Sequence, residues 1–327
     1  MILAGDIGGT NTRLAFLEER GGRLTPVAES TFASHEHASL ETVLRKFVSA
    51  QHLPVTRAAF GIAGPVKRGR CDATNLPWVV DARLVAREIG LPSVGLINDL
   101  EANTWGIPAL QPEDFVVLNE GEANAEGNAA IISAGTGLGE AGVYWDGRQS
   151  RPFATEGGHA DFAPRNHLEM ELLDYLLKQF QRVSYERVVS GPGLLNIYRF
   201  LRDSDRGEEP PWLAERMRQQ DPAAVISAAA LKGESDLCVQ ALDLFVSIYG
   251  AEAGNLGLKI MATGGVYLGG GIAPKIIGKL KDPLFLNAFT AKGRMKPLLQ
   301  AMPVRVILND KTALLGAARF ATLCAPE

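Results

Sequence analysis

The sequence predicts an α/β protein of about two domains. The chain has 327 residues, more than one domain usually contains. Apolar runs of strand length alternate with segments whose apolar residues recur at helical spacing. A strand, a glycine-rich turn and a second strand at residues 2–17 recur at residues 129–145, about 126 positions later. That period is far longer than the repeats of solenoid proteins, so it indicates two related domains.

The first half is predicted to alternate strands with two helices. Gly21-Gly22 forms the turn before the third strand. The apolar spacing of Leu40–His52 predicts a helix, and Asp81 is placed to cap the next one. Trp78 lies in a proline-containing turn and is expected to be exposed. The predicted strands are Ile2–Gly5, Leu14–Leu17, Arg23–Phe32, Ala58–Ala63 and Val94–Ile97.

The second half is predicted to contain most of the helices. Asp146-Gly147 is a strong hairpin-turn signal, and Pro274 suits the first turn of a helix. The predicted strands are Phe115–Leu118, Ala129–Ser133, Glu140–Trp145, Val266–Leu268 and Val304–Leu308. The predicted helices are Leu168–Gln181, Gly193–Leu201, Leu213–Arg218, Leu237–Lys259 and Lys311–Cys324.

The loop-like segment Pro108–Pro112 marks the predicted domain boundary. We expect the last helix to pack back on the first half. The smaller N-terminal α/β domain would then contain residues 1–109 plus 309–327, and the larger α/β domain residues 110–308.

The glycine turn between the first two strands is a candidate phosphate site. Gly8 and Gly9 carry no Cβ, so their backbone N–H groups can approach a ligand, and successive N–H groups form an anion-binding concavity. Asp6 ends the strand before the turn, a suitable place for a carboxylate that holds a phosphate-bound Mg²⁺ through water. Further side-chain donors are Thr10, Asn11 and Thr12. The alternative is an ordinary hairpin without a ligand.

Short polar groups suited to a hydroxyl-rich ligand follow other predicted strands. Asn98-Asp99 ends a buried strand, where α/β proteins tend to place functional groups, although Asn98 and Glu101 also have the spacing of a capping box. Two glycines separate Glu156 from His159, so both can face one small ligand; a metal site and a plain surface turn are the alternatives. Glu186 is a third candidate that alone resembles any helix-face carboxylate.

Composition favours a soluble globular protein with a sizeable core. The chain is 46% hydrophobic and 21% charged, with a net charge of −4 and scattered basic residues, which argues against nucleic acid as the main partner. No uninterrupted apolar run suggests a membrane span, and the N-terminus does not resemble a signal peptide. The distant cysteines Cys71, Cys238 and Cys324 form no metal or redox motif, which fits a cytoplasmic location.

Together, five motifs resemble the bacterial ATP-dependent glucokinases of the actin-like ATPase superfamily. They are DIGGTNTR (Asp6–Arg13), LIND (Leu96–Asp99), SAGTGLG (Ser133–Gly139), EGGH (Glu156–His159) and GGGIAP (Gly269–Pro274). The resemblance spans nearly the whole chain. It implies two actin-like ATPase (ribonuclease H-like) α/β domains, each with a mixed sheet, and an interdomain cleft that holds sugar and ATP.

The resemblance also implies roles for residues. The activity would be transfer of the γ-phosphoryl of MgATP to the 6-hydroxyl of glucose, the first step of glycolysis, with Asp99 as the base and Asp6 orienting Mg²⁺. The sugar would be bound by Asn98, Asp99, Glu156, His159 and Glu186, and bordered by Gly64 and Asn75. The phosphates would be cradled by Gly8, Gly9, Thr10, Asn11, Thr12, Gly135, Thr136 and Gly137, with Gly270 and Gly271 by the adenosine. Family members are usually dimers, so a homodimer is expected.

One departure separates the chain from a nearby family. The ROK sugar kinases and repressors carry a cysteine-rich zinc motif after their histidine, whereas here His159 is followed by no cysteine before Cys238. ROK repressors also carry a DNA-binding domain ahead of the phosphate loop, and only five residues precede Asp6 here. The alternatives left open are a kinase for another hexose, such as mannose or N-acetylglucosamine, and a non-catalytic sugar-sensing regulator. A chaperone-like ATPase is less favoured, because it would need a further substrate domain.

Overall fold

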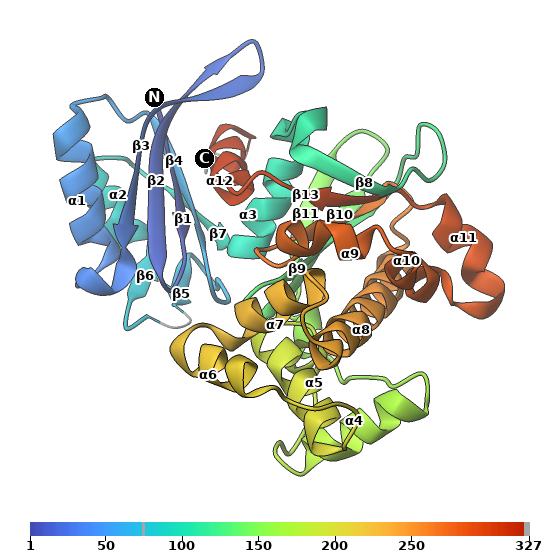
Figure 1. Ribbon diagram of the computed structural model, residues 1–327. Helices are drawn as coiled ribbons and strands as arrows, with labels where there is room; N and C mark the ends of the chain where they lie inside the picture. Colours follow the sequence, from blue (N-terminus) through green and yellow to red (C-terminus); the bar gives the residue numbers. More distant parts are fainter. Residues whose placement is uncertain (74–75, 324–327) are drawn as a thin grey trace. The chain divides into compact units, whose positions relative to one another are not determined.

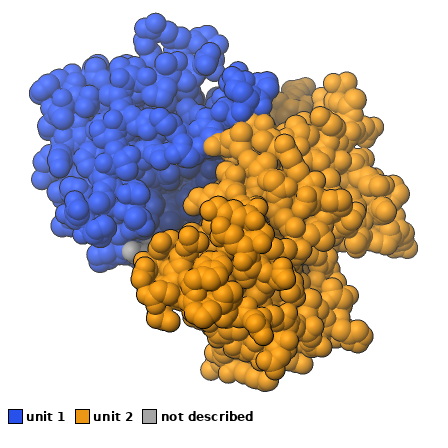
Figure 2. Space-filling view, in the orientation of Figure 1, with its two compact units in different colours: residues 1–114, 152–154, 309–327 blue, residues 115–151, 155–308 orange. Residues whose placement is uncertain are grey.

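The computed structural model describes residues 1–73 and 76–323. Contacts within the chain divide it into two compact units, coloured separately in Figure 2. Unit 1 comprises residues 1–114, 152–154 and 309–327, and unit 2 comprises residues 115–151 and 155–308. Both are α/β structures with a central mixed sheet, as predicted.

The sheet of unit 1 has the strand order β3-β2-β1-β4-β7. The strands are β1 (Ile2–Ile7), β2 (Asn11–Arg20), β3 (Arg23–Ala33), β4 (Arg57–Ile62) and β7 (Gly95–Asn98). The β1–β2 and β2–β3 pairs are antiparallel, whereas β1–β4 and β4–β7 are parallel. Parallel pairing brings the carboxyl ends of β1, β4 and β7 to one edge, where Asp6 and Asn98 lie.

Helices cover both faces of this sheet (Figure 1). On one face, α1 (Leu40–Gln51) and α2 (Ala82–Ile89) bury apolar side chains against β1, β2 and β4. On the other face lie α3 (Asp99–Gly106) and α12 (Thr312–Leu323), the last helix of the chain. The return of α12 to the first half is therefore confirmed.

Glycines set the close contact between α3 and α12. A Cβ on Gly316 would lie 1.7 Å from the carbonyl oxygen of Ala102, and a Cβ on Gly106 would lie 2.0 Å from that of Thr312. Any larger residue at either position would push the helices apart. Since α3 begins at Asp99, this packing fixes the helix whose first turn carries the predicted base.

The sheet of unit 2 repeats the order of unit 1 and adds one strand: β11-β10-β9-β12-β13-β8. Its strands are β8 (Phe115–Asn119), β9 (Ala129–Ala134), β10 (Leu138–Trp145), β11 (Ser150–Ala154), β12 (Gly265–Gly269) and β13 (Val304–Ile307). The β9–β10 pair is antiparallel, and β9–β12 and β12–β13 are parallel, as for β1, β2, β4 and β7. The duplication predicted from the two glycine turns is confirmed at the level of topology.

Most of the helices described belong to unit 2. They are α4 (His167–Leu177), α5 (Gly191–Asp203), α6 (Pro211–Gln219), α7 (Pro222–Leu231), α8 (Asp236–Ile260), α9 (Ile277–Leu280), α10 (Pro283–Thr290) and α11 (Lys296–Ala301). Of the described residues, only α8 forms a helix long and apolar enough to cross a membrane, and 78% of its most apolar stretch is buried in the structure. It is the central helix of the unit 2 core.

Several expectations differ from the structure. Trp78 is buried, not exposed: its ring packs in the apolar cluster that includes α1, and its indole N–H donates to the carbonyl of His37. By contrast, Pro274 lies in the first turn of a helix as predicted, here a short 3₁₀ helix (Ala273–Ile276) before α9. The sequence analysis did not predict β5 (Arg70–Asp72), β6 (Val79–Asp81), β11, α7, α10 or α11.

Candidate active site

The first glycine turn is braced from inside unit 1. The N–H of Gly8 donates to the carbonyl of Asn11 at 2.9 Å, which closes the turn. Ser34 supports it twice: its backbone N–H donates to Thr10 O, and its hydroxyl donates to Gly8 O, both at 2.9 Å. The buried hydroxyl of Thr12 lies 3.0 Å from that of Ser34. The buried Thr12 side chain thus supports the turn through Ser34.

The side chains that this turn exposes are Thr10 and Asn11, while Gly9 is partly buried. Ser34 was missed by the sequence analysis because it comes from the 3₁₀ helix after β3 (Ser34–Glu36). Only the pairing of β3 with β2 brings it to the turn.

Asp6 lies at the end of β1 opposite Arg13 on β2. Burial raises its pKa to about 6; Arg13 lowers it in part and Asp310 raises it further. The guanidinium of Arg13 is engaged elsewhere, since it donates to the carbonyl and carboxylate of Asp310 at 2.8 and 2.9 Å and lies 3.9 Å from Glu29. Asp6 is therefore a partly buried carboxylate whose charge is incompletely balanced, which suits a cation.

Asn98 caps α3, as the capping-box alternative predicted. Its side-chain oxygen accepts the N–H groups of Leu100 and Glu101 at 2.9 and 3.3 Å. Its amide nitrogen donates to Gly64 O at 3.1 Å, so Asn98 also ties down the loop after β4. Toward the described residues the Asn98 amide donates this one bond, so capping leaves it a second hydrogen for a ligand. Asp99 is the first residue of α3, and its Oδ1 accepts the N–H of Leu100 at 2.9 Å.

The second glycine turn, Gly135–Gly137, closes in the same manner. The N–H of Gly135 donates to Gly137 O at 2.9 Å, and Thr136 is exposed. Glu186 lies directly beside the turn, because its Oε2 accepts the N–H of Leu138 at 3.1 Å. A Cβ on Gly137 would lie 2.6 Å from that oxygen, so glycine is needed for this approach.

Glu156, His159 and Glu186 come together in unit 2. The imidazole of His159 lies 3.9 Å from the Glu156 carboxylate through Nε2 and 4.0 Å from that of Glu186 through Nδ1. The side chains are 66% exposed for Glu156, 54% for His159 and 30% for Glu186. Two carboxylates flanking an imidazole in reach of solvent can accept from and donate to neighbouring hydroxyl groups.

Both glycines of the Glu156–His159 segment are required by what lies beneath them. Residues Gly157–His159 form a 3₁₀ turn above β10. A Cβ on Gly157 would lie 2.0 Å from Oε2 of Glu140, and one on Gly158 would lie 1.9 Å from Leu138 O. The turn can therefore pack directly on the strand, and Glu140 is a neighbour that the sequence analysis did not single out.

Gly270 and Gly271 follow β12, alongside the end of β9. Gly270 has φ +80°, and a Cβ there would lie 2.3 Å from Ala134 O, so the position requires glycine. Gly271 faces open space. Asn75 lies outside the described residues.

The described part of the chain contains no cluster of three or more His, Cys, Asp or Glu side chains arranged to hold a metal ion by themselves. Within residues 1–73 and 76–323, Glu156, His159 and Glu186 thus do not form such a cluster. A Mg²⁺ ion bound largely by phosphate oxygens and water needs only one or two carboxylates, which Asp6 fits.

Comparison with known proteins is consistent with this arrangement. The glucokinase family model matches residues 3–323. The glucokinase of Nostoc sp. is 45% identical over 99% of this chain and 98% of its own. The crystal structure of a glucokinase from an Antarctic psychrotroph is 31% identical, with a TM-score of 0.86 and 98% of each chain covered.

A more distant structure shares the fold. The ROK family glucokinase from Streptomyces griseus, solved in complex with glucose and AMPPNP, is 22% identical, with a TM-score of 0.63, 98% of this chain and 99% of that chain covered. The motifs, the two related sheets and the matches across the full length agree: this chain belongs to the glucokinase family, in its bacterial, non-ROK form.

Proposed function

We propose that the protein transfers the γ-phosphoryl group of MgATP to the 6-hydroxyl of glucose. The observation that carries this proposal is the convergence of Glu156, His159 and Glu186 within about 4 Å in a chain of the glucokinase family. Exposed carboxylates and an imidazole are side chains that bind several neighbouring sugar hydroxyls. The adenine nucleotide and glucose bound by the Streptomyces griseus glucokinase support the same pair of substrates.

In this proposal unit 1 supplies the chemistry. Asp99 accepts the proton of the sugar hydroxyl as that oxygen attacks phosphorus, while Asn98 donates to the sugar. Asp6 holds Mg²⁺ through water, and the bound ion neutralises charge on the phosphates. The pKa of Asp6, raised to about 6 by burial, keeps the carboxyl mostly ionised at pH 7. Gly64, tied to Asn98, and Asn75 border the sugar.

Both glycine turns bind phosphate in this proposal. The exposed donors at the first turn are Thr10 and Asn11, beside the backbone of Gly8 and Gly9, while Thr12 supports the turn from below. Residues Gly135–Gly137 bind phosphate oxygens in unit 2, and Gly270 and Gly271 lie by the adenosine. Backbone N–H groups suit this task because they carry no competing charge.

Other properties follow from membership of the family. We propose that residues 1–109 plus 309–327 and residues 110–308 are the functional domains, and that the protein acts as a cytoplasmic homodimer with no nucleic-acid or membrane partner. Expression of residues 110–308 alone would test the first point, and ultracentrifugation of the whole chain would test the second.

A coupled assay tests the activity. Purified protein is given MgATP and glucose, mannose or N-acetylglucosamine, and release of ADP is followed. A second channel detects glucose 6-phosphate with its dehydrogenase. We expect kcat/KM for glucose to exceed that for the other sugars at least roughly tenfold, because a pocket built to pair each hydroxyl discriminates against sugars that leave one unpaired. Faster turnover of another hexose, or sugar binding without ADP release, would contradict the proposal.

A further inference from the structure

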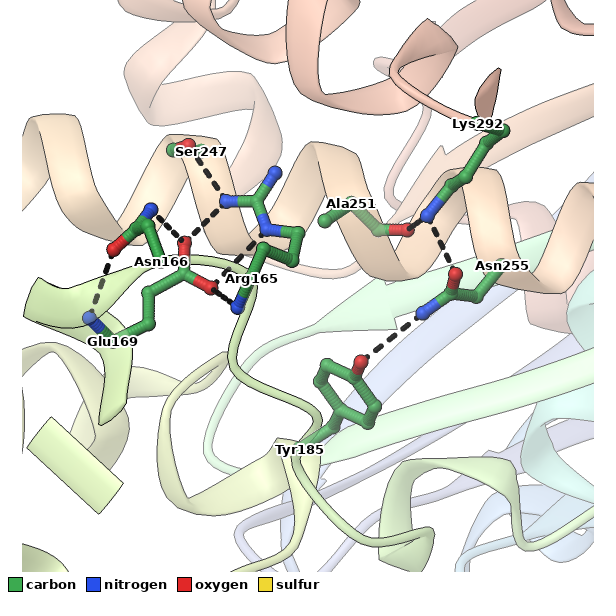
Figure 3. Close-up of polar contacts among 8 residues, drawn as sticks. All are labelled: Arg165, Asn166, Glu169, Tyr185, Ser247, Ala251, Asn255 and Lys292. Atoms are coloured by element: carbon green, nitrogen blue, oxygen red, sulfur yellow. Dashed lines mark hydrogen bonds and ion pairs between the residues drawn. The ribbon is translucent and has the colours of Figure 1, made fainter. Parts of the chain in front are cut away.

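Beneath the Gly157–His159 turn lies a connected set of buried polar groups that the proposed reaction does not use. It begins at Glu140 on β10, which is 1% exposed, and continues to Glu252 on α8, which is fully buried. Figure 3 shows its outer part, where Tyr185, Asn255 and Lys292 meet along α8. Charged and polar groups buried this deeply are costly unless they have a function or complete pairing.

Glu140 supports the turn at two points. Its carboxyl lies against the Cα of Gly157, where the missing Cβ would be 2.0 Å from Oε2. Its carbonyl accepts the hydroxyl of Thr155 at 2.8 Å, and that hydroxyl accepts the N–H of Gly157 at 3.2 Å. Side chain and backbone of one residue thus contact the start of the turn that presents Glu156 and His159.

Glu252 is bonded by two side chains of its own helix, α8. Asn255 donates to its Oε2 at 2.8 Å, and Lys259 lies 3.2 Å from its Oε1. The amide of Asn255 also donates to the hydroxyl of Tyr185 at 3.0 Å. Tyr185 directly precedes Glu186, and its backbone N–H donates to the carbonyl of Ala160, at the end of the turn. The network therefore joins the segments that carry all three proposed sugar ligands.

The two carboxyls of this network, Glu140 and Glu252, are neighbours. Among the described residues, no N–H or hydroxyl reaches Oε1 of Glu140. Burial and the neighbouring negative charge of Glu252 raise the pKa of Glu140 to about 8, and Lys259 opposes this only in part. A protonated Glu140 that donates to Glu252 gives the buried carboxyl the partner it otherwise lacks.

We propose that Glu140 is a positioning residue. By donating a hydrogen bond to Glu252, it holds the Gly157–His159 turn on β10 and so orients Glu156 and His159 for sugar binding. The proposal rests on the proposed function, because it assigns those two residues to sugar binding. Loss of the proton places two negative charges side by side under the turn, so affinity for glucose falls as pH rises through about 8.

Other titratable groups face the pair. Tyr249 and Lys259 of α8 and Tyr185 approach it directly, and burial raises the pKa of both tyrosines. Farther away, Arg165 forms an ion pair with Glu169, and its charge lowers the pKa of Tyr185 in part. Lys292 needs a control, because burial and nearby cations lower its pKa to about 8. Burial keeps both tyrosines neutral, and Lys292 can only lose a positive charge. Of the groups with a shifted pKa here, only Glu140 therefore adds a negative charge at the turn as pH rises through about 8.

The first test is the variant Glu140→Gln, an isosteric amide that donates to Glu252 at every pH. We expect its KM for glucose to match the wild type at pH 7 and to stay flat to pH 9, whereas that of the wild type rises roughly tenfold. The KM for ATP should change less than about twofold in both. A wild-type pH profile in Glu140→Gln would overturn the inference.

Two controls use the same chemistry elsewhere. Glu169→Gln alters another fully buried carboxylate, which pairs with Arg165 (Figure 3), and Lys292→Gln removes the lysine that titrates in the same range. Both should keep the rise in KM between pH 7 and pH 9. If Lys292→Gln abolished it, Lys292 and not Glu140 would be responsible, and the inference would be wrong.

A double-variant cycle tests the contact itself. Gly157→Ala places a methyl group on the Glu140 carboxyl, so we expect a rise of roughly tenfold or more in glucose KM. Replacing Glu140 by Ala in that background removes the obstructing carboxyl and should restore part of the affinity. Additive losses in Gly157→Ala/Glu140→Ala would contradict a direct contact.

A spectroscopic readout keeps this inference separate from the proposed function. Difference infrared spectra of wild type and Glu140→Gln should show a protonated carboxyl band at pH 6 that is lost above pH 9, whether or not glucose is turned over. Absence of that band at pH 6 would overturn the inference alone. A band without sugar phosphorylation by the wild type would instead overturn the proposed function.

Discussion

The two glycine turns have the same topology but different supports. In unit 1, the turn after β1 is braced by Ser34 and Thr12, which are buried and have no proposed contact with substrate. In unit 2, the turn after β9 is braced by Glu186, whose second carboxylate oxygen approaches His159. In the proposed function, the supports of the unit 1 turn serve nucleotide binding alone, whereas Glu186 links the unit 2 turn to sugar binding.

The largest expected effect lies in unit 1. Asp99→Asn should lower kcat by roughly 10²–10⁴, because the amide cannot accept the proton of the sugar hydroxyl. The variant keeps an oxygen for the N–H of Leu100, so α3 should still begin at the same residue. Steady-state rates with saturating glucose and MgATP measure the effect. A kcat near that of the wild type would remove Asp99 from the role of base.

The variant Asp6→Asn should lower catalytic efficiency but raise the stability of the unliganded protein. We expect kcat/KM for MgATP to fall about 10²-fold, since the Mg²⁺ ligand is weakened. The folded state raises the pKa of Asp6 from 3.8 to about 6, so it binds the proton more tightly than the unfolded chain does. Stability of the unliganded protein thus falls as pH rises from about 4 to about 6 and stays lower at pH 7.

The amide in Asp6→Asn carries no charge to bury. At pH 7 the free energy of unfolding of the variant should therefore exceed that of the wild type by up to ~3 kcal/mol, and its unfolding temperature should be higher. Thermal unfolding at pH 4 is the control, where the difference should largely vanish. An Asp6→Asn protein that is less stable at pH 7 would mean that Arg13 pairs with Asp6 more strongly than with Asp310.

Variants of Glu156, His159 and Glu186 test whether the second glycine turn is linked to sugar binding. Glu156→Gln and His159→Ala should each raise the KM for glucose roughly 10- to 100-fold and leave that for ATP nearly unchanged. Glu186→Gln should raise both, because the same carboxylate binds the N–H of Leu138 at the second glycine turn. If Glu186→Gln changed only the glucose KM, the proposed difference between the units would disappear.

The smallest expected effect is at Ser34. Ser34→Ala removes the hydroxyl that donates to Gly8 O and leaves the Thr12 hydroxyl without a partner. We expect a loss of about 1–3 kcal/mol in unfolding free energy and a rise of a few-fold in the KM for ATP. The glucose KM should not change. A rise in glucose KM equal to that for ATP would show that this turn is linked to the sugar as well.

The sequence was sufficient for features that depend on local pattern. Apolar periodicity located the sheets and longest helices, and glycine spacing revealed both turns and the duplication. The sugar ligands were predicted only because five weak motifs occur in order, and they remain a prediction. Ser34 and Glu140 could not be found, since their functional neighbours come from strand pairing and from a turn that packs on β10. Trp78 was misjudged because proline turns are usually exposed, whereas its ring packs into the apolar cluster that includes the side chains of α1.

Asn98 shows why local pattern and function need not exclude each other. Its side-chain oxygen caps α3, as its spacing indicated, and its amide also reaches Gly64. A helix cap placed at the carboxyl end of a strand fixes Asp99 at a defined point. The competing interpretations of this pair were therefore compatible, which spacing alone could not reveal.

Calorimetric titration of glucose into Asp99→Asn tests the central claim most directly. If Asp99 is a base and not a structural cap, the dissociation constant for glucose should stay within about threefold of the wild type, in a preparation whose turnover has fallen at least roughly 10²-fold. A loss of glucose affinity as large as the loss of turnover would contradict the account, since Asp99 would then serve binding or folding and another group would take the proton.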